Sequence, residues 1–255
     1  MRRLVMFLAL MILLHGLVSP VHADSAAINR LLGRGINMGN MLEAPVEGEW
    51  GPALDEKWNV LLREVLAIIR QANPNRTVLI GTAEWGGVGG FSSLKFPKND
   101  KNLILTVHYY NPFRFTHQGA GWAGKESQSW LGTIWNGTYA EKMALRNELQ
   151  AVKEFSDATG VPVHVGEFGA YSKGDLASRA RWASYCAKLF EKLGFSWAYW
   201  EFCAGFGAYD PVKKAWREEL ANALISSDSS ILETGQPPAH CSAMSNIAVD
   251  IPPPV

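Results

Sequence analysis

The sequence predicts an α/β protein in which helices pack outside a parallel sheet. Short apolar runs, typical of buried strands, alternate with longer segments whose apolar residues recur at helical spacing. Polar and aromatic residues follow several of the apolar runs, as they do at the carboxyl edge of a parallel sheet. Together these observations favour a domain whose ligand site lies at that edge.

Residues 1–23 are expected to be a signal peptide rather than part of this domain. Arg2 and Arg3 form a positive start, residues 4–18 are apolar but too short to span a bilayer, and residues 21–23 offer small side chains for cleavage. We expect a mature chain without a membrane anchor. It would be secreted to the extracellular space or the periplasm.

The domain itself is expected to occupy residues 24–226. Its predicted strands are residues 35–38, 77–81, 103–109, 161–166 and 195–200. Two long segments rich in Gly and Trp, 81–100 and 111–136, follow strands and are expected to be loops at the carboxyl edge.

Four helices are predicted between and after the strands. The first contains apolar residues at one-face spacing from Trp58 to Ile69, and the second begins at a capping box formed by Thr138 and Glu141 and ends at Gly160. The others are expected over 175–194 and 213–224, so that Trp58, Trp182 and Trp216 pack within helices. Residues 227–255, rich in Ser, Pro and Ala, are expected to be a disordered tail.

Composition narrows the classes of partner. Lys plus Arg and Asp plus Glu both number 24, so no strong field steers nucleic acid or an anionic membrane to the surface. The three cysteines are an odd number, which argues against a disulfide framework. No His-Glu-x-x-His or Gly-x-Ser-x-Gly pattern occurs, so we expect no metal, no other cofactor and no serine mechanism.

Candidate site residues lie where predicted strands end. Glu167 follows one strand directly, His108 and Tyr110 come at the end of another, and Trp200 ends the last. Strand ends of a parallel sheet converge on one cleft, so these residues are expected to meet. Three of them also have a plainer interpretation: Glu167 as an exposed carboxylate, His108 as a satisfied buried histidine and Trp200 as a core residue.

Several stretches in the same order resemble glycoside hydrolase family 5, the bacterial cellulase family. The resemblance covers nearly everything from residue 33 to residue 224. It is carried by the segments GRGINMGN (33–40), LILTVHYYN (103–111), GTIWNGT (132–138), VHVGEFG (163–169) and WAYWEF (197–202).

This resemblance implies a (β/α)8 TIM-type barrel that cleaves β-1,4-linked glucans with retention of configuration. On the matching positions, Glu167 would be the nucleophile, His108 and Tyr110 would lie beside it in the cleft, and Trp200 would lie under the sugar. Asn40 is expected to line the cleft. On the loops, Trp85, Trp122 and Trp135 are expected either to stack on sugar rings or to cover apolar surface.

The chain departs from the family where the acid/base carboxylate should be. The family's Asn-Glu-Pro motif is absent, and strands two to four of the barrel are missing, so that about five of the eight strands are recognisable. The sheet would have to stay open, close differently, or borrow strands from a second copy in a homo-oligomer. Substitute acids are Glu43, Glu47, Glu49, Glu84 and Glu201, of which Glu84 is favoured.

Three functional hypotheses follow. The chain is an endoglucanase that works with a substitute acid, a glycan-binding remnant that no longer cleaves, or the record of a deletion that folds poorly. Its partner in the first two cases is a β-glucan polysaccharide or oligosaccharide.

Overall fold

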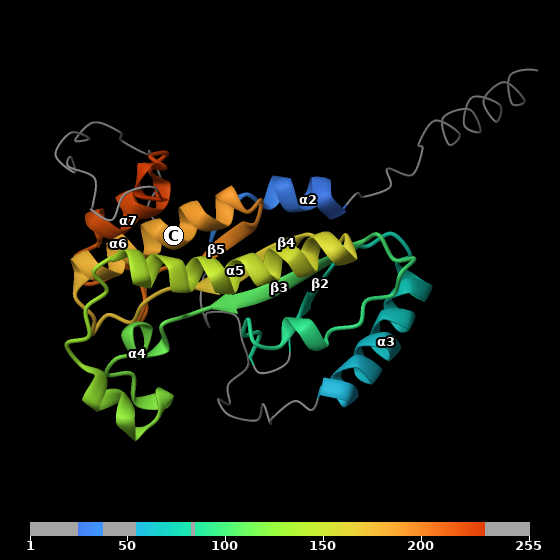
Figure 1. Cartoon of the computed structure of the whole chain (residues 1–255), viewed down its shortest axis with the longest axis horizontal. Helices are drawn as coiled ribbons and strands as arrows, with labels where there is room; N and C mark the ends of the chain where they lie inside the picture. Colours follow the sequence, from blue (N-terminus) through green and yellow to red (C-terminus); the bar gives the residue numbers. More distant parts are fainter. Residues whose placement is uncertain (1–24, 38–54, 83–84, 233–255) are drawn as a thin grey trace, which may run out of the picture.

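In the part of the chain that the structure describes, five parallel strands form one sheet, and the helices pack around it (Figure 1). The computed structural model describes residues 25–37, 55–82 and 85–232. The strands are β1 (Arg34–Asn37), β2 (Val78–Gly81), β3 (Leu103–Tyr109), β4 (Val163–Phe168) and β5 (Ser196–Trp200). All five coincide with predicted strands to within two residues, which confirms that part of the prediction.

The strand order identifies an incomplete β/α barrel. From β2 to β5, consecutive strands are neighbours, and β5 then pairs with β1, which gives the order β1-β5-β4-β3-β2. Consecutive parallel strands are neighbours all around a closed β/α barrel. The one break in this order therefore lies between β1 and β2, where the sequence predicts that strands are missing.

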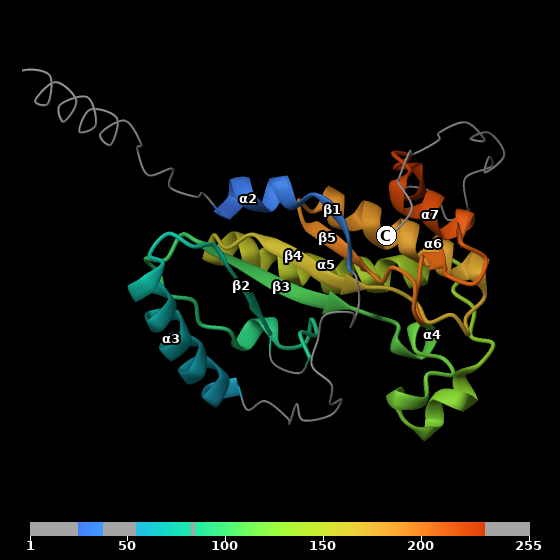
Figure 2. The same cartoon turned by 180° about the vertical axis from the view of Figure 1, so that it is seen from behind.

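The long helices lie along the sheet and at its ends (Figure 2). They are α2 (Ser25–Leu32), α3 (Asp55–Ala72), α5 (Tyr139–Thr159), α6 (Leu176–Lys192) and α7 (Glu218–Ile225). Shorter elements are α4 (Phe113–Thr116), η2 (Phe91–Ser93), η3 (Gly121–Ala123), η4 (Lys125–Trp130), η5 (Ser230–Leu232) and the hairpin β6 (Tyr209–Asp210) with β7 (Ala215–Trp216). The predicted capping box of α5 is confirmed, since Glu141 N donates to Thr138 Oγ1 and Thr138 N donates to Glu141 Oε2.

The hydrophobic core lies between the sheet and helices α5 and α6. Val107, Tyr109 and Phe168 on the strands are fully buried there. The alternate positions, such as Thr106, His108 and His164, are half-buried and face the other side of the sheet. In a closed barrel the face opposite the helices is the interior. The polar residues of these strands therefore lie on the interior face of the incomplete barrel.

Two predictions about the end of the chain are wrong. The helix expected over 213–224 begins only at Glu218, because residues 209–216 form a hairpin in which the Tyr209 and Trp216 rings meet at 5.6 Å. Trp216 is consequently 39% exposed in a strand instead of packed in a helix.

The tail that was expected to begin at residue 227 does not begin there. Ile231 and Leu232 are buried in the core, and Lys142 Nζ donates to the Ile231 carbonyl at 2.8 Å. Residues 227–232 therefore belong to the folded domain, because two apolar side chains suffice to hold a short segment against α5 and α6. Residues 1–23 and 233–255 lie outside the described residues.

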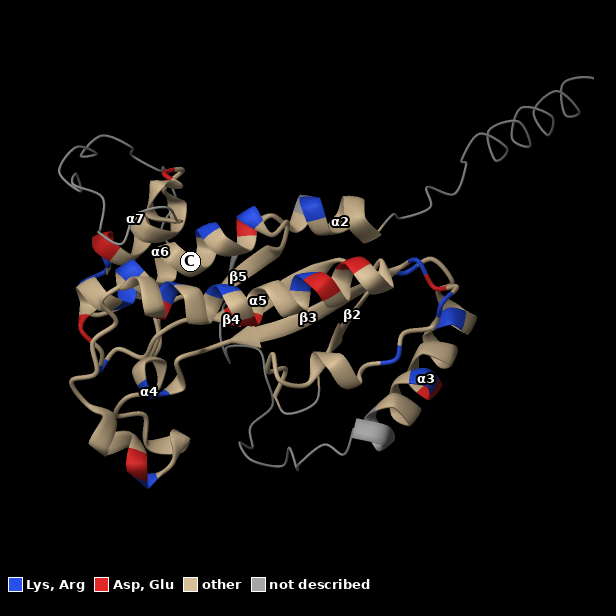
Figure 3. Ribbon diagram, in the orientation of Figure 1, with Lys and Arg blue, Asp and Glu red and all other residues tan. Residues whose placement is uncertain are grey.

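Charged side chains of both signs are interspersed over the outer helices (Figure 3). In the described residues, no helix combines the length and apolar character needed to cross a membrane. Cys186 and Cys203 are free thiols, and Cys186 is buried.

Candidate active site

A β-bulge places Glu167 beside His108. Along the β3–β4 ladder, Val107 lies opposite Val165, but the next pair joins His108 to Glu167, so Gly166 is an extra residue on β4. A Cβ atom on Gly166 would lie 2.7 Å from Thr106 Oγ1, which leaves little room for a side chain at the bulge. Bulges re-aim the side chains that follow them, and this one keeps Glu167 on the face away from the helices.

The Glu167 carboxylate is held by two neighbours from the end of β3. The Tyr110 hydroxyl donates to Glu167 Oε2 at 2.9 Å, and His108 Nδ1 lies 3.3 Å from the same oxygen. The His108 and Glu167 side chains are 29% and 21% exposed, so the group is recessed but open to solvent. The structure thus brings together three residues that sequence analysis singled out.

Burial fixes the protonation of both neighbours at neutral pH. It raises the pKa of Tyr110 well above its usual range, and the nearby Glu167 charge adds to this effect. Burial also lowers the pKa of His108 to about 4, although a hydrogen bond to the Trp85 backbone opposes the shift. Tyr110 therefore keeps its proton for the hydrogen bond to Glu167, and His108 is neutral.

The loop after β2 closes over His108. The His108 N–H donates to the Gly86 carbonyl at 2.7 Å, and a Cβ on Gly86, whose φ is +78°, would lie 3.0 Å from the imidazole ring. Glycine at this position lets the backbone lie against the ring. The preceding residue, Trp85, is 74% exposed at the rim.

Aromatic residues from three loops extend the site on the other side. We call Tyr110, His117, Trp122, Tyr171 and Phe206 the aromatic wall. His117 contacts Tyr110 edge to face at 5.0 Å, Phe206 lies 5.9 Å from Tyr110, and Trp122 meets Tyr171 at 4.8 Å. The wall runs from the carboxylate to Trp122, which is 62% exposed.

Three members of this wall were not among the predicted site residues: His117, Tyr171 and Phe206. Each lies in a loop that follows a strand of the sheet, after β3, β4 and β5 respectively. A search for aromatic and histidine residues within ten positions after each predicted strand would have found all three.

The other predicted site residues have mixed outcomes. Trp200 ends β5 half-buried, and its peptide bond to Glu201 is cis. The prediction that Trp135 stacks on a sugar is wrong, because this residue is 1% exposed and its ring packs on Tyr185 at 5.8 Å in the core. The remaining candidates lie outside the described residues: Asn40, Glu43, Glu47, Glu49 and Glu84.

Glu201 is an unsuitable substitute acid. Its side chain is 3% exposed, Oε1 accepts a hydrogen bond from Phe206 N and Oε2 accepts one from Ala204 N, both at 3.0 Å. The carboxyl group therefore organises the loop that carries Phe206 instead of facing a substrate. In the part of the chain that the structure describes, no group of three or more His, Cys, Asp or Glu side chains is arranged to hold a metal ion.

Gly169 allows the strand ends of the site to pack closely. A Cβ atom at this position would lie 2.1 Å from the Trp200 carbonyl oxygen. We expect Gly169→Ala to lower the free energy of unfolding by about 1–3 kcal/mol, because backbone atoms must move apart to admit the methyl group. Urea denaturation measures this. Gly121→Ala, where a Cβ would meet nothing within 4 Å, is the control and should change stability far less.

The buried histidines predict a loss of stability in mild acid. Burial lowers the pKa values of His108 and His117 to about 4, from 6.5 for an exposed histidine. Between pH 6.5 and pH 4 the unfolded chain binds protons that the folded chain does not, so unfolding becomes easier as pH falls. The loss amounts to about 3 kcal/mol per histidine at most. Urea midpoints at pH 7 and pH 4.5 test this, and His117→Gln should reduce the difference.

The fold and the site together define a class of protein. A carboxylate held by a tyrosine at the carboxyl edge of a partial β/α barrel, beside a wall of aromatic rings, is an arrangement typical of glycoside hydrolases. Residues 40–205, more than half of the chain, match the family described as "Cellulase (glycosyl hydrolase family 5)". The chain belongs to that family.

Curated relatives of the chain are endoglucanases. It is 30% identical over 193 residues to Endoglucanase H of Acetivibrio thermocellus, an alignment that covers 73% of this chain and 20% of that protein. It is 26% identical to Endoglucanase C of the same organism, with 66% of this chain and 56% of that protein covered. The chain thus spans little more than half the length of these relatives, or less.

Solved structures show the same relationship. Endoglucanase Cel5A of Thermotoga maritima matches with a TM-score of 0.73 and 33% identity, over 80% of this chain and 100% of that one. The same enzyme in complex with mannotriose matches with a TM-score of 0.65 and 48% identity, over 68% of this chain and 55% of that one. These likenesses support the incomplete barrel described above.

Proposed function

We propose that the chain is a secreted glycoside hydrolase that acts on β-1,4-linked glucans by double displacement, with Glu167 as nucleophile. The observation that carries the proposal is the hydrogen bond of 2.9 Å from the Tyr110 hydroxyl to Glu167 Oε2. A hydrogen bond to the charged form keeps a carboxylate ionised and oriented. An ionised carboxylate at the carboxyl edge of a β/α barrel is the group that the first displacement requires.

The first step would form a covalent bond between Glu167 and the anomeric carbon. His108, neutral at the same carboxylate, adds no positive charge that would weaken the nucleophile. Trp200 is proposed to lie under the sugar ring, where an aromatic face favours the positive charge of the transition state. The aromatic wall would hold the rest of the glycan.

The described residues at the strand ends supply no evident proton donor for the leaving group. A retaining enzyme holds two carboxyl groups about 5 Å apart, and at the strand ends of the described sheet the second carboxylate, Glu201, is occupied by backbone hydrogen bonds. Glu84 lies outside the described residues and stays a proposal for this role. Substrates that need little protonation should therefore react best.

An activated aryl cellobioside tests the proposal. Its phenolate leaves without a proton donor, so we expect measurable hydrolysis with retention, weak or no release from carboxymethylcellulose, and faster turnover when azide attacks the glycosyl intermediate. Thermotoga maritima Cel5A forms complexes with both mannotriose and cellobiose. An aryl mannobioside should accordingly be compared. A folded chain that leaves both aryl glycosides intact contradicts the proposal.

A glycan-binding role without cleavage is the second candidate. It is favoured by the two exposed tryptophans at the rim, Trp85 at 74% and Trp122 at 62% exposure, together with the occupied state of Glu201. In that case cellotetraose should bind in calorimetry while both aryl glycosides remain uncleaved. Trp122→Ala should then weaken binding by about 1–3 kcal/mol if its ring stacks on a sugar.

A further inference from the structure

Phe206 is the centre of the aromatic wall. Its ring contacts every other member, with centroid distances of 5.9 Å to Tyr110, 5.6 Å to His117, 6.3 Å to Trp122 and 5.5 Å to Tyr171. Side chains in a protein interior interlock with few voids, so a shift of one ring moves those that it contacts. The position of Phe206 therefore sets where the other four rings lie.

Buried side chains hold the backbone of Phe206 from both sides. Its N–H donates to Glu201 Oε1 at 3.0 Å. Its carbonyl oxygen accepts two hydrogen bonds of 3.0 Å, one from Arg179 Nη2 and one from the Tyr199 hydroxyl. All three side chains are buried, so these hydrogen bonds lie in a medium of low dielectric constant that strengthens them. We call Arg179, Tyr199 and Glu201 the Phe206 clamp.

Arg179 is the member of the clamp that joins two loops. Its Nε donates to the Ala170 carbonyl in the loop after β4 at 2.8 Å, while its Nη2 donates to Phe206 in the loop after β5. A guanidinium presents its N–H groups in a rigid planar fork, so the two carbonyl groups are held at a fixed separation. Burying a charge is costly, and an apolar side chain of similar size would fill the same space. The main effect expected of Arg179 is therefore on the geometry of the two loops.

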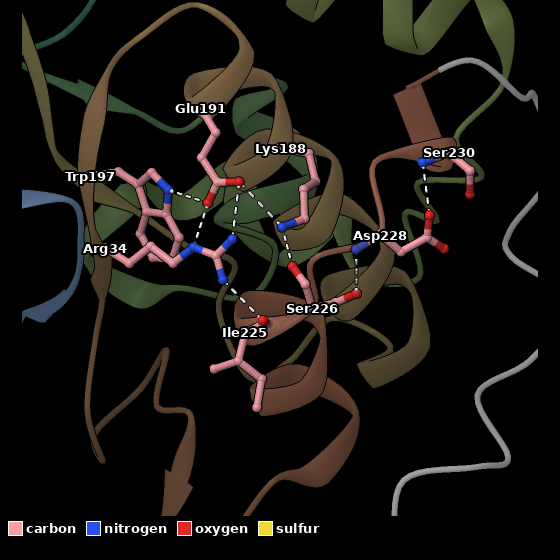
Figure 4. Close-up of polar contacts among 8 residues, drawn as sticks. All are labelled: Arg34, Lys188, Glu191, Trp197, Ile225, Ser226, Asp228 and Ser230. Atoms are coloured by element: carbon pink, nitrogen blue, oxygen red, sulfur yellow. Dashed lines mark hydrogen bonds and ion pairs between the residues drawn. The ribbon is translucent and has the colours of Figure 1, made fainter. Parts of the chain in front are cut away.

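Helix α6 gives Arg179 a fixed support. Arg179 lies near the start of this helix, and Figure 4 shows how the far end is anchored. There Arg34 Nε of β1 lies 2.7 Å from Glu191 Oε1, and Lys188 Nζ donates to the Ser226 carbonyl that follows α7. The clamp therefore fixes the two loops relative to the sheet as well as to each other.

The clamp reaches the carboxylate of Glu167 through Tyr110. The Tyr110 ring meets Phe206 at 5.9 Å and His117 at 5.0 Å, both edge to face, and its hydroxyl donates to Glu167 Oε2 at 2.9 Å. A tyrosine side chain turns about two bonds unless neighbours hold it, so loss of the Phe206 contact would let the hydroxyl leave the carboxylate. A misplacement of about 1 Å at a reacting group can cost about 100-fold in rate.

We propose that Arg179 is a positioning residue for Glu167. By holding Phe206 against the Tyr110 ring, it keeps the Tyr110 hydroxyl on the nucleophile. Arg179 is 2% exposed, so it acts through these two residues and does not touch the glycan. Because this role is defined by the nucleophile, it rests on the function proposed above.

Hydrolysis of an aryl cellobioside tests the role of Arg179. Arg179→Met removes the donors but keeps a long apolar side chain, and kcat/KM is expected to fall about tenfold or more. Arg179→Lys should give an intermediate value, because an ammonium donates to carbonyl groups but lacks the rigid fork. Arg146→Met on α5 is the matched control and should leave kcat/KM unchanged, since Arg146 Nη2 donates to the Leu232 carbonyl, outside the site, at 3.2 Å. Far-UV circular dichroism verifies folding, and Tyr199→Phe, which removes one hydroxyl from the clamp, replaces Arg179→Met if that variant fails to fold.

A double-mutant cycle shows whether Arg179 acts through Tyr110. Tyr110→Phe removes the hydrogen bond to Glu167 and should lower kcat/KM about 10- to 100-fold. In that background Arg179→Met should change kcat/KM less than about twofold, because no hydroxyl remains to be misplaced.

Two results overturn the positioning role alone. One is full activity in Arg179→Met. The other is a pair of losses that multiply in the double variant, since a residue that only stabilises the domain would lower activity by the same factor in both backgrounds. An unaltered chain that hydrolyses neither aryl glycoside overturns the proposed function, and this role with it, so the unaltered chain tells the two failures apart.

Discussion

Replacing Glu167 by Ala is expected to lower kcat/KM for an aryl cellobioside by about 10³-fold or more. The carboxylate is the group proposed to bond to the anomeric carbon, and Tyr110 holds it at 2.9 Å. Without it the first displacement has no nucleophile. The methyl group of Ala leaves a space beside Tyr110 and His108 that a small anion can enter.

Azide makes this experiment decisive. In Glu167→Ala, azide would attack the anomeric carbon from the vacated side in a single displacement, so the product should be the α-glycosyl azide. In the unaltered chain azide would intercept the intermediate and give the β-anomer. Glu154→Ala, which removes an exposed carboxylate of α5, is the control and should retain full activity. Unchanged hydrolysis in Glu167→Ala would show that another residue is the nucleophile.

Replacing Phe168 by Ala is expected to lower the free energy of unfolding by about 3–5 kcal/mol. The ring is fully buried and meets Phe190 at 5.0 Å, Trp197 at 5.3 Å and Tyr199 at 5.4 Å, all edge to face. Its removal leaves a cavity between β4, β5 and α6 that rigid aromatic neighbours fill poorly. Edge-to-face pairs are also lost, and each contributes about 0.5–1.5 kcal/mol.

Equilibrium urea unfolding followed by tryptophan fluorescence measures this effect. Tyr139→Ala is the matched aromatic control, since that ring is 76% exposed in the first turn of α5, and its cost should stay below about 1 kcal/mol. Equal losses in the two variants would mean that the buried aromatic cluster does not dominate stability.

The strands could be predicted because their signal is local. Leu103–Tyr109 has the predicted bounds, and α5 has the predicted ends because a capping box and a left-handed Gly160 mark them within the sequence itself. The hairpin at 209–216 could not be predicted in the same way. It depends on Arg217, whose Nη1 donates to the carbonyls of Gly207 and Tyr209, a contact that exists only in the folded chain.

The site residues also divide into those with a local sequence signal and those whose position depends on contacts in the folded chain. Glu167, His108 and Tyr110 lie within two residues of a strand end, so the alternation of a parallel sheet locates them. Trp122 and Trp135 lie in one loop region, and the sequence gives no signal that distinguishes a surface ring from a buried one. Their environments differ because Ser178 Oγ of α6 donates to the Trp135 carbonyl at 3.0 Å and draws that ring into the core, whereas Trp122 rests on Tyr171 at the surface.

The strand that bears Glu167 lies in the middle of the order β1-β5-β4-β3-β2. Local opening of a sheet starts at its outermost strands, and in the described order two strands lie on either side of β4. Although the barrel is incomplete, Glu167 therefore lies on the central strand of the described sheet, which is the strand best protected from local unfolding.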